Sequence, residues 1–305
     1  YSGATVGWIP ESDVDVTDAP VAPPTQKALF GYGSTGSHVS MSNLVNSSGV
    51  VATDTTGVGT ARSGLAAAGY GTDKAIFGYG TTGSLSSLSN LVNNSGVVAT
   101  DVTGVGTARD FLAAASYGLD KAIFGYGGSY SSLTNLVNNS GVVAADVTGV
   151  GTARRGPAAA SYGTDKAIFG YGRTGSTLSM TNLVSSSGVV ATDVTGVGTA
   201  RAYAGAAGYG GDKAIFGYGE TTLSMTNLVS NSGVVASDVT GVGTGRGYSA
   251  ASGYGGDKAL FGYGYTGSAI SVTNLVSNSG VVATDTTGVG TARYSLGAAG
   301  YSLSA

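Results

Sequence analysis

The sequence of 305 residues carries few charges, with 10% charged residues and a formal net charge of -3, and it contains no cysteine. The weak negative charge excludes a basic surface that would attract nucleic-acid phosphates, and the missing cysteines exclude disulfides, a thiolate nucleophile and a Cys-ligated metal. No stretch reaches the roughly 18 consecutive apolar residues of a membrane-spanning helix, so we expect neither nucleic acid nor a membrane as a partner.

Residues 1 to 26 differ in composition from the rest of the chain. They are rich in prolines and acidic side chains, which predicts an extended linker or docking arm that reaches other protein subunits of an assembly. Trp8, the only tryptophan, either anchors this arm on the rest of the molecule, which we favour, or inserts into a neighbouring subunit. The chain begins with Tyr1 rather than Met, as expected of a processed chain or a piece of a longer one.

Residues 27 to 305 consist of repeats. The segment K-A-(I/L)-F-G-Y-G occurs six times and begins at Lys27, Lys74, Lys121, Lys166, Lys213 and Lys258. Successive copies are 45 or 47 residues apart, as from 27 to 74 and from 121 to 166. A period of this size indicates a propeller or a solenoid.

Each repeat contains four pieces of strand length. The first piece is K-A-I-F-G-Y-G, and a loop of variable length connects it to the second piece, which contains N-L-V. The third piece is S-G-V-V-A-(T/A/S)-D, which is followed by T-G-V-G-T-(A/G)-R. The fourth piece is a run of small residues such as 66–71. Turn sequences such as 93–96 separate the second and third pieces. The first and last pieces are apolar on both faces, which predicts inner strands packed between neighbouring sheets.

The two ends of the repeated part predict how it closes. The small-residue run occurs six times, and the last copy reaches the C-terminus with no K-A-I-F-G-Y-G behind it, whereas the copy at Lys27 has no such run in front of it. The last strand can therefore complete the first blade and leave no unmatched sheet. We predict an all-β chain with residues 27–305 forming a six-bladed β-propeller, four antiparallel strands in each blade, and the ring closed by the C-terminal strand.

The order of pieces also carries a resemblance. One unit runs from Arg62 through the small strand 66–71 and the apolar strand 73–80 to Asn90-Leu91-Val92 and Asp101, which resembles the kelch repeat. This resemblance implies partner-binding residues on one face, around the mouth of the axis. The amino-acid sequence of the repeat, which includes G-V-V-A-T-D-V-T-G-V-G-T-A-R, is similar to repeats of virion structural and tail-fibre-like proteins of marine tailed phages. This similarity implies a role in a virion or extracellular assembly.

The six copies differ mainly in two places, the three residues after each repeated arginine and the loop before N-L-V. In a four-stranded meander both connections lie at the same edge of the blade, so we expect them on one face of the disc. Tyr and Arg are frequent there, and these residues dominate binding hot spots, although drift of exposed loops after duplication would also vary them. The candidate binding residues are His38, Asp110, Phe111, Tyr130, Arg155, Arg173, Tyr203, Glu220, Tyr248, Tyr265 and Tyr294.

Catalysis has little support in the sequence. His38 is the only histidine and Glu220 the only glutamate of the repeats, so neither a repeated base nor a histidine metal site is available. The repeated Asp, Lys and Arg fit structural pairing between strands, and the aspartates that precede Thr-Gly are expected to cap turns. We expect no catalytic residue, metal or cofactor, and an enzyme built around Glu220, Asp212 and Tyr248 is the least favoured hypothesis.

The sequence therefore favours a non-enzymatic structural or adhesion component of a virion, such as a tail fibre or decoration, or of another extracellular assembly, with a variable loop face for binding. The alternative is a lectin-like propeller that binds a cell-surface glycan or receptor. Because the variable loops differ between copies, one composite face is favoured over six equal sugar sites. Asn46, Asn93 and Asn138 lie in N-X-S sequons, and their glycosylation stays open.

Overall fold

The computed structural model describes residues 26–220 and 222–302. The predicted arm, with Trp8, lies outside the described residues except for Gln26. Within the described ranges the chain forms eighteen strands. They are β1 (Lys27–Ser34), β2 (His38–Val45), β3 (Ala66–Tyr70), β4 (Lys74–Gly78), β5 (Ser89–Val92), β6 (Ala113–Tyr117), β7 (Lys121–Gly125), β8 (Thr134–Val137), β9 (Ala158–Tyr162), β10 (Lys166–Gly170), β11 (Thr181–Val184), β12 (Gly205–Tyr209), β13 (Lys213–Gly217), β14 (Thr226–Val229), β15 (Ala250–Tyr254), β16 (Lys258–Tyr265), β17 (Ala269–Val276) and β18 (Gly297–Tyr301).

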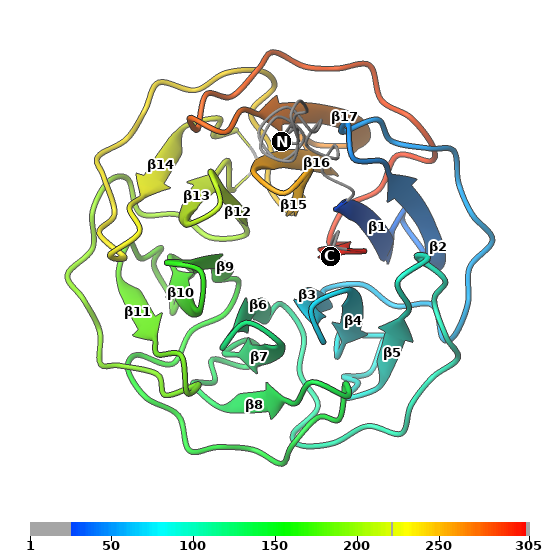
Figure 1. Ribbon diagram of the computed structural model, residues 1–305, viewed down its shortest axis with the longest axis horizontal. Coiled ribbons are helices and arrows are strands. Elements are labelled where there is room, and N and C mark those ends of the chain that lie inside the picture. The colour runs from blue at the N-terminus through cyan, green and yellow to red at the C-terminus, as the bar shows by residue number, and fades with distance from the viewer. Residues whose placement is uncertain (1–25, 221, 303–305) are drawn as a thin grey trace, which may run out of the picture.

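The strands of each repeat form one three-stranded antiparallel sheet. The small-residue strand lies at one edge, the K-A-I-F-G strand in the middle and the N-L-V strand at the other edge, as in the order β3-β4-β5. Figure 1 shows the six sheets arranged around a common axis with the small-residue strands innermost. These inner strands contact one another in cyclic order, including β18 with β3. The all-β repeats are therefore arranged as in a β-propeller.

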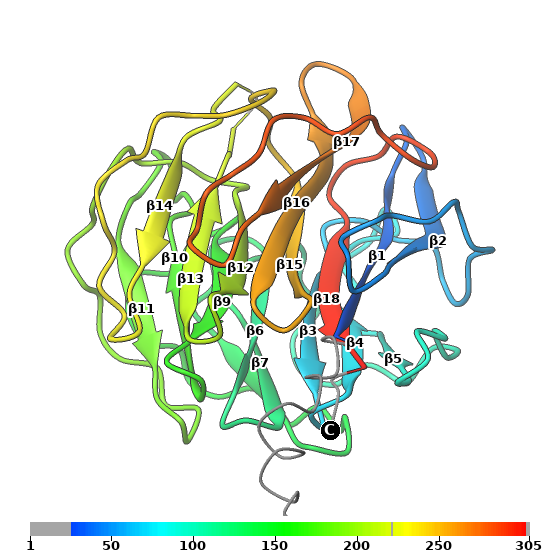
Figure 2. The same cartoon turned by 45° about the horizontal axis from the view of Figure 1, so that its top comes forward.

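The two ends of the described chain lie in the same sheet. β18 pairs with β1 from Lys27 opposite Tyr301 to Gly31 opposite Gly297, and β1 pairs on its other side with β2. Figure 2 shows β18 beside β1. The last strand thus occupies the place that the small-residue strand occupies in every other sheet.

Small side chains let neighbouring sheets approach closely. In β4 the residues after Lys74 are all buried, in keeping with the predicted apolar strand covered on both faces. A Cβ on Gly78 would lie 2.7 Å from the Cζ atom of Phe124 in the next sheet. The glycine that ends each K-A-I-F-G strand therefore makes room for the phenylalanine of its neighbour.

The predicted fourth strand of each repeat is wrong, because the structure has three strands in each sheet. The segment after β5 meets that strand at two isolated bridges, made by Val98 and Val102, and at one backbone hydrogen bond of 2.8 Å from the N–H of Ala99 to the carbonyl of Leu91. Between them the Asn90 side chain donates hydrogen bonds to the carbonyl of Ala99, 3.0 Å away, and to the carboxylate of Asp101, 2.9 Å away. Because the asparagine takes the Ala99 carbonyl that a continuous ladder would use, each described sheet has three strands and a bridged outer segment instead of four strands.

Candidate functional site

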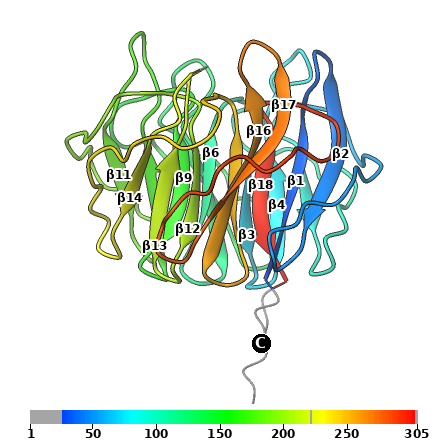
Figure 3. The same cartoon turned by 90° about the horizontal axis from the view of Figure 1, so that it is seen from above.

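The two variable sets meet at one end of the ring. Isolated bridges join a residue after the repeated arginine to a residue of the hairpin loop in the same repeat, as in Ser63 with Thr81, Arg155 with Arg173 and Gly247 with Tyr265. We call this end, formed by the three residues after each repeated arginine and the loops between the middle and outer strands, the variable face. Figure 3 shows the β1–β2 and β16–β17 hairpins projecting at this end. The predicted juxtaposition of the two sets is present in the structure.

Backbone hydrogen bonds form a complete circle around the axis at this face. Each bond runs from the N–H of one repeat to the carbonyl of the preceding repeat, with lengths from 2.6 to 2.9 Å. The members of this axial hydrogen-bond ring are Gly64, Phe111, Gly156, Tyr203, Tyr248 and Ser295. All have positive φ, from 48° at Phe111 to 65° at Gly156. Four of them are not glycine, so these residues adopt a conformation that costs energy outside a supporting frame.

Aromatic side chains from this ring gather over the axis. Tyr203 and Tyr248 are stacked with ring centroids 4.3 Å apart, and Phe111 meets them edge-on at 5.3 and 5.9 Å. Phe111 reaches Tyr203 across the intervening repeat because that repeat has Gly156, where a Cβ would lie 2.6 Å from Tyr203 Cε1. We call Phe111, Tyr203 and Tyr248 the aromatic cluster. Tyr294 extends it, 6.2 Å from Tyr248 and 4.9 Å from Tyr265.

Charged candidates surround the aromatic cluster. Arg155 forms a 2.7 Å ion pair with Asp110 and lies over the ring of Phe111, 4.5 Å from its centroid. Burial raises the pKa of Asp110, and the charge of Arg155 opposes this shift. The backbone of Arg155 is bridged to that of Arg173.

Glu220 lies close to the aromatic cluster. Its Oε1 atom accepts a hydrogen bond of 3.2 Å from the backbone N–H of Ala202, the residue before Tyr203. Burial, with Tyr203 and Glu220 nearby, raises the pKa of Tyr248 to about 12 against the opposing charges of Arg173 and Arg155. Oppositely charged side chains therefore lie near Tyr248 without making the site strongly acidic or basic.

Two predicted residues lie away from the aromatic cluster. His38 begins β2 and its Nδ1 atom lies 3.2 Å from Ser63 Oγ. Tyr130 lies between β7 and β8 with 48% of its surface exposed, and among the described residues its ring has no partner in the aromatic cluster. The predicted set thus divides into a central group and two peripheral members.

A small cavity of about 70 Å³ adjoins the aromatic cluster and is lined by the axial ring residues and the residue that follows each of them. Ser249 and Ser295 line it, are 8% and 7% exposed, and have hydroxyl oxygens without a hydrogen-bond partner in the structure. Sequence reasoning singled out the triplets that contain these serines but did not select them. The sequence contains a signal for them, because among the second and third residues after the six repeated arginines only these two are serine.

The repeated arginines have structural partners. Arg62 is fully buried, donates to the carbonyls of Tyr79 at 2.8 Å and Thr60 at 3.1 Å, and donates to Asn90 Oδ1 at 2.6 Å. Its guanidinium lies over the ring of Tyr32 in the neighbouring sheet, 4.6 Å from the centroid. The arginine–asparagine bond recurs in all six repeats. The repeated arginines therefore hold neighbouring sheets together, in agreement with the predicted structural role of these charged residues.

The repeated aspartates bind a distant segment where the sequence predicted local turn caps. Asp101 accepts hydrogen bonds from the N–H and Oγ1 of Thr60, which lies in the preceding repeat. Asp54 accepts the same bonds from Thr291, near the other end of the chain. Burial alone would raise the pKa of Asp54, but hydrogen bonds from Thr291 and Asn43 and the charge of Arg293 lower it. The carboxylates therefore join successive repeats.

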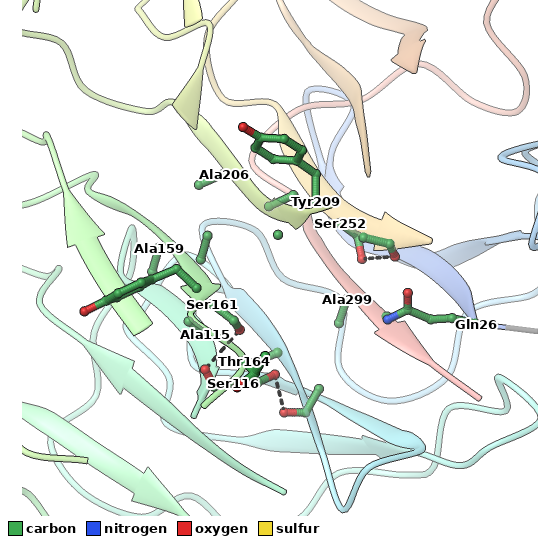
Figure 4. Close-up of a pocket in the computed structure, with 18 of the residues that line it drawn as sticks. Gln26, Ala115, Ser116, Ala159, Ser161, Thr164, Ala206, Tyr209, Ser252 and Ala299 are labelled. Carbon is green, nitrogen blue, oxygen red and sulfur yellow. Dashed lines mark hydrogen bonds between the residues drawn. The ribbon is translucent and has the colours of Figure 1, made fainter. Parts of the chain in front are cut away.

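The opposite end of the ring contains a larger cavity of about 330 Å³, lined mainly by Ala, Gly and Ser of the inner strands. Figure 4 shows Ser116, Ser161 and Ser252 on its wall with Gln26 at its edge. Ser116 Oγ donates to the carbonyl of Gly69 at 2.8 Å. The inner-strand positions that line this cavity have only Ala, Gly, Ser or Tyr in every repeat, as with Gly69, Ser116 and Ser161 at one equivalent position, so they vary less than those of the other end.

The structure separates the three residues of the enzyme hypothesis. Asp212 precedes β13, pairs with Lys213 at 3.0 Å and lines the larger cavity, whereas Glu220 follows β13 and lies at the variable face with Tyr248. Among the described residues, no three His, Cys, Asp or Glu side chains gather as metal ligands. In that same part of the chain no helix has the length and apolarity to cross a membrane.

Comparison with known proteins assigns no family. No family model matches this sequence, and no curated protein is similar enough to count as a relative.

Proposed function

We propose that this chain is a closed six-bladed β-propeller without catalytic activity that binds a partner through its variable face. Support for closure comes from the pairing of β18 with β1, the cyclic contacts of the inner strands and the axial hydrogen-bond ring. The bridged outer segment of each repeat is then a rudimentary fourth strand. The propeller positions six different triplets on one rigid rim.

The contrast between the two ends of the ring carries the binding proposal. At the opposite end the Asp–Lys pair recurs in five repeats and the lining side chains are mostly small, whereas at the variable face Phe111, Arg155 and Tyr294 have no identical residue at the equivalent position of another repeat, and Tyr203 is matched only by Tyr248. Tyr and Arg contribute strongly to protein interfaces. A rim held by backbone hydrogen bonds presents them at little entropic cost. Aromatic and basic residues that differ between most repeats, on a rigid rim, favour one composite binding face.

The biological setting that we propose is a virion, as a tail-fibre or decoration component, or another extracellular assembly. The similarity of the repeat sequence to repeats of phage virion proteins supports this setting. The position of Gln26, which lines the cavity opposite the variable face, also supports it. Residues 1–26 would then attach the ring to other subunits from one end while the variable face points outward. A module with separate ends for attachment and recognition suits adhesion.

Electron cryo-microscopy of the native particle, with residues 1–26 intact, tests the proposal. We expect rings attached at the Gln26 end with the aromatic cluster facing solvent or a bound partner. Rings attached through the variable face, or free rings beside particles that lack them, would contradict it.

A further inference from the structure

The cavity beside the aromatic cluster is large enough for one short substituent of a ligand, but not for a whole ring. Its volume of about 70 Å³ is roughly half that of the about 150 Å³ cavity that accommodates a benzene ring. A hydroxymethyl group fits this space, while a six-membered ring must remain outside on the rim. The group that enters is therefore short and attached to a larger body.

The cavity wall requires a polar occupant at one point. Ser249 Oγ and Ser295 Oγ are buried and have no hydrogen-bond partner, and each hydroxyl can donate one bond and accept others. Buried polar groups are normally bonded, so an unpaired pair beside a cavity indicates a partner that enters it. A hydroxyl group can bond to both serines because it donates and accepts.

The aromatic cluster provides the surface for the larger body. Tyr203 and Tyr248 are stacked, and Phe111 closes one side of the pair. The stacking occupies one face of each tyrosine ring. The other face of each ring carries the negative potential that attracts the weakly positive C–H groups of a saturated ring. The axial hydrogen-bond ring holds all three backbones, so the surface is formed before a ligand arrives.

The charges around the site favour an uncharged ligand. Arg155 and Arg173 contribute two positive charges, Asp110 and Glu220 contribute two negative charges, and Arg155 is already paired with Asp110 at 2.7 Å. A balanced set attracts neither an anion nor a cation strongly, but it offers donors and acceptors for several hydroxyls. A neutral polyhydroxylated ring matches this pattern better than an acidic sugar or a charged peptide.

The site occurs once in the chain. At the position of Ser249 the other repeats have Leu65, Leu112, Pro157, Ala204 and Leu296. At the position of Ser295 they have Gly64, Phe111, Gly156, Tyr203 and Tyr248. The two serines therefore come from adjacent repeats and form one pair.

We propose that the variable face binds one neutral sugar residue of a glycan, with its ring on Phe111, Tyr203 and Tyr248 and a hydroxymethyl group between Ser249 and Ser295. This inference rests on the proposed function, because it names the ligand class of the same face.

The test uses the full chain on an array of glycans with neutral or acidic terminal sugars, followed by calorimetry with the methyl glycoside of the best neutral sugar. We expect one site per chain and about tenfold weaker binding for the analogue without the hydroxymethyl oxygen. Ser249→Ala and Ser295→Ala should weaken binding by a similar factor. The matched control is Ser252→Ala, also buried and on the neighbouring β15, but lining the opposite cavity.

Unchanged thermal unfolding of the serine variants establishes that they fold, so their loss of binding reports the site. Binding to acidic glycans alone, or to an aromatic or charged peptide instead of a sugar, overturns the sugar inference. If no sugar binds while native particles show the variable face in contact with a protein partner, the inference fails and the proposed function stands. If no sugar binds and the ring is attached to the particle through the variable face, both fail.

Discussion

Each repeat buries a charged guanidinium that is held by its neighbours. Arg62 donates to two carbonyls and to Asn90, and it lies over Tyr32 of the adjacent sheet. A buried charge costs much less when most of its donors are bonded, and here only the Nε atoms of Arg154 and Arg201 lack a partner among the repeated arginines. The buried acceptors depend in turn on the arginine as their donor. The arginine therefore connects neighbouring sheets through specific contacts, and an apolar side chain of similar size cannot replace it.

Replacing this arginine by an apolar residue of similar length tests that role. We expect Arg62→Met to lower the free energy of unfolding by about 3 kcal/mol or more, because Asn90 Oδ1 and the Tyr79 carbonyl lose their donor in a buried site. Lys74→Met is the control, since the Lys74 side chain is 42% exposed and its surface ion pair contributes under about 1 kcal/mol. If urea denaturation shows that Arg62→Met and Lys74→Met lower the free energy of unfolding equally, the structural role of Arg62 is contradicted.

The buried tyrosine of the same network makes stability depend on alkaline pH. Burial raises the pKa of Tyr32 from 10.0 to about 12, although Arg62 opposes the shift; Tyr79, Tyr171 and Tyr218 behave in the same way. A raised pKa in the folded state stabilises the fold below the unfolded pKa, and this contribution disappears as pH rises through the folded value. We expect urea midpoints to fall between pH 10 and about 12.

The Tyr32→Phe variant isolates this contribution. It removes the hydroxyl that donates to the Val58 carbonyl at 3.1 Å, so its midpoint should be lower at neutral pH and should fall less steeply in the alkaline range. A slope identical to that of the unchanged protein would show that Tyr32 does not titrate with unfolding.

At the level of elements, the segment that enters each inner strand determines the shape of the variable face. Its second residue has positive φ in all six repeats and belongs to the axial hydrogen-bond ring. The sequence indicates where these segments vary, but not that Phe111, Tyr203 and Tyr248 would adopt the left-handed conformation, since glycine occupies the position in only two repeats. The circle of hydrogen bonds depends on six separate segments, which no local pattern reveals.

Gly156 provides a test of this arrangement. It has φ of 65°, and a Cβ there would lie 2.6 Å from Tyr203 Cε1. Gly156→Ala should cost about 1–3 kcal/mol and displace Tyr203 from Tyr248, seen as altered near-ultraviolet circular dichroism. Gly175→Ala, which would meet no heavy atom within 4 Å, should stay within about 0.5 kcal/mol. An undisturbed spectrum in Gly156→Ala would refute the role of this glycine in positioning the cluster.

At the level of the whole molecule, the internal repeats made most of the architecture predictable. The six copies of K-A-(I/L)-F-G-Y-G and the unmatched small-residue strand at 297–301 predict four strands per repeat, of which the structure has three, and the pairing of the last strand with the first, which the structure confirms. The outer segment has strand length, which predicts a full strand. The Asn90 side chain instead takes the Ala99 carbonyl and also bonds to the Asp101 carboxylate, and such tertiary competition is not visible in a local pattern.

The connection between the ends predicts that the chain can be opened elsewhere. The natural break lies between an inner and a middle strand, and the equivalent turn between β6 and β7 contains Leu119, which is 69% exposed. A circular permutant with residues 302 and 26 joined by a short flexible linker and new ends beside Leu119 should fold, because no buried pairing is cut.

A permutant opened between Ile123 and Phe124, both fully buried, is the control and should fail to fold. Circular dichroism and thermal unfolding of the two proteins measure the difference. If the first permutant also fails, the noncovalent pairing of β18 with β1 cannot be replaced by the pairing of β6 with β7, and the repeats are not equivalent members of a closed ring. If it folds with a midpoint near that of the natural chain, the six sheets are interchangeable, and the variable triplets on one face remain the main feature that distinguishes one repeat from another.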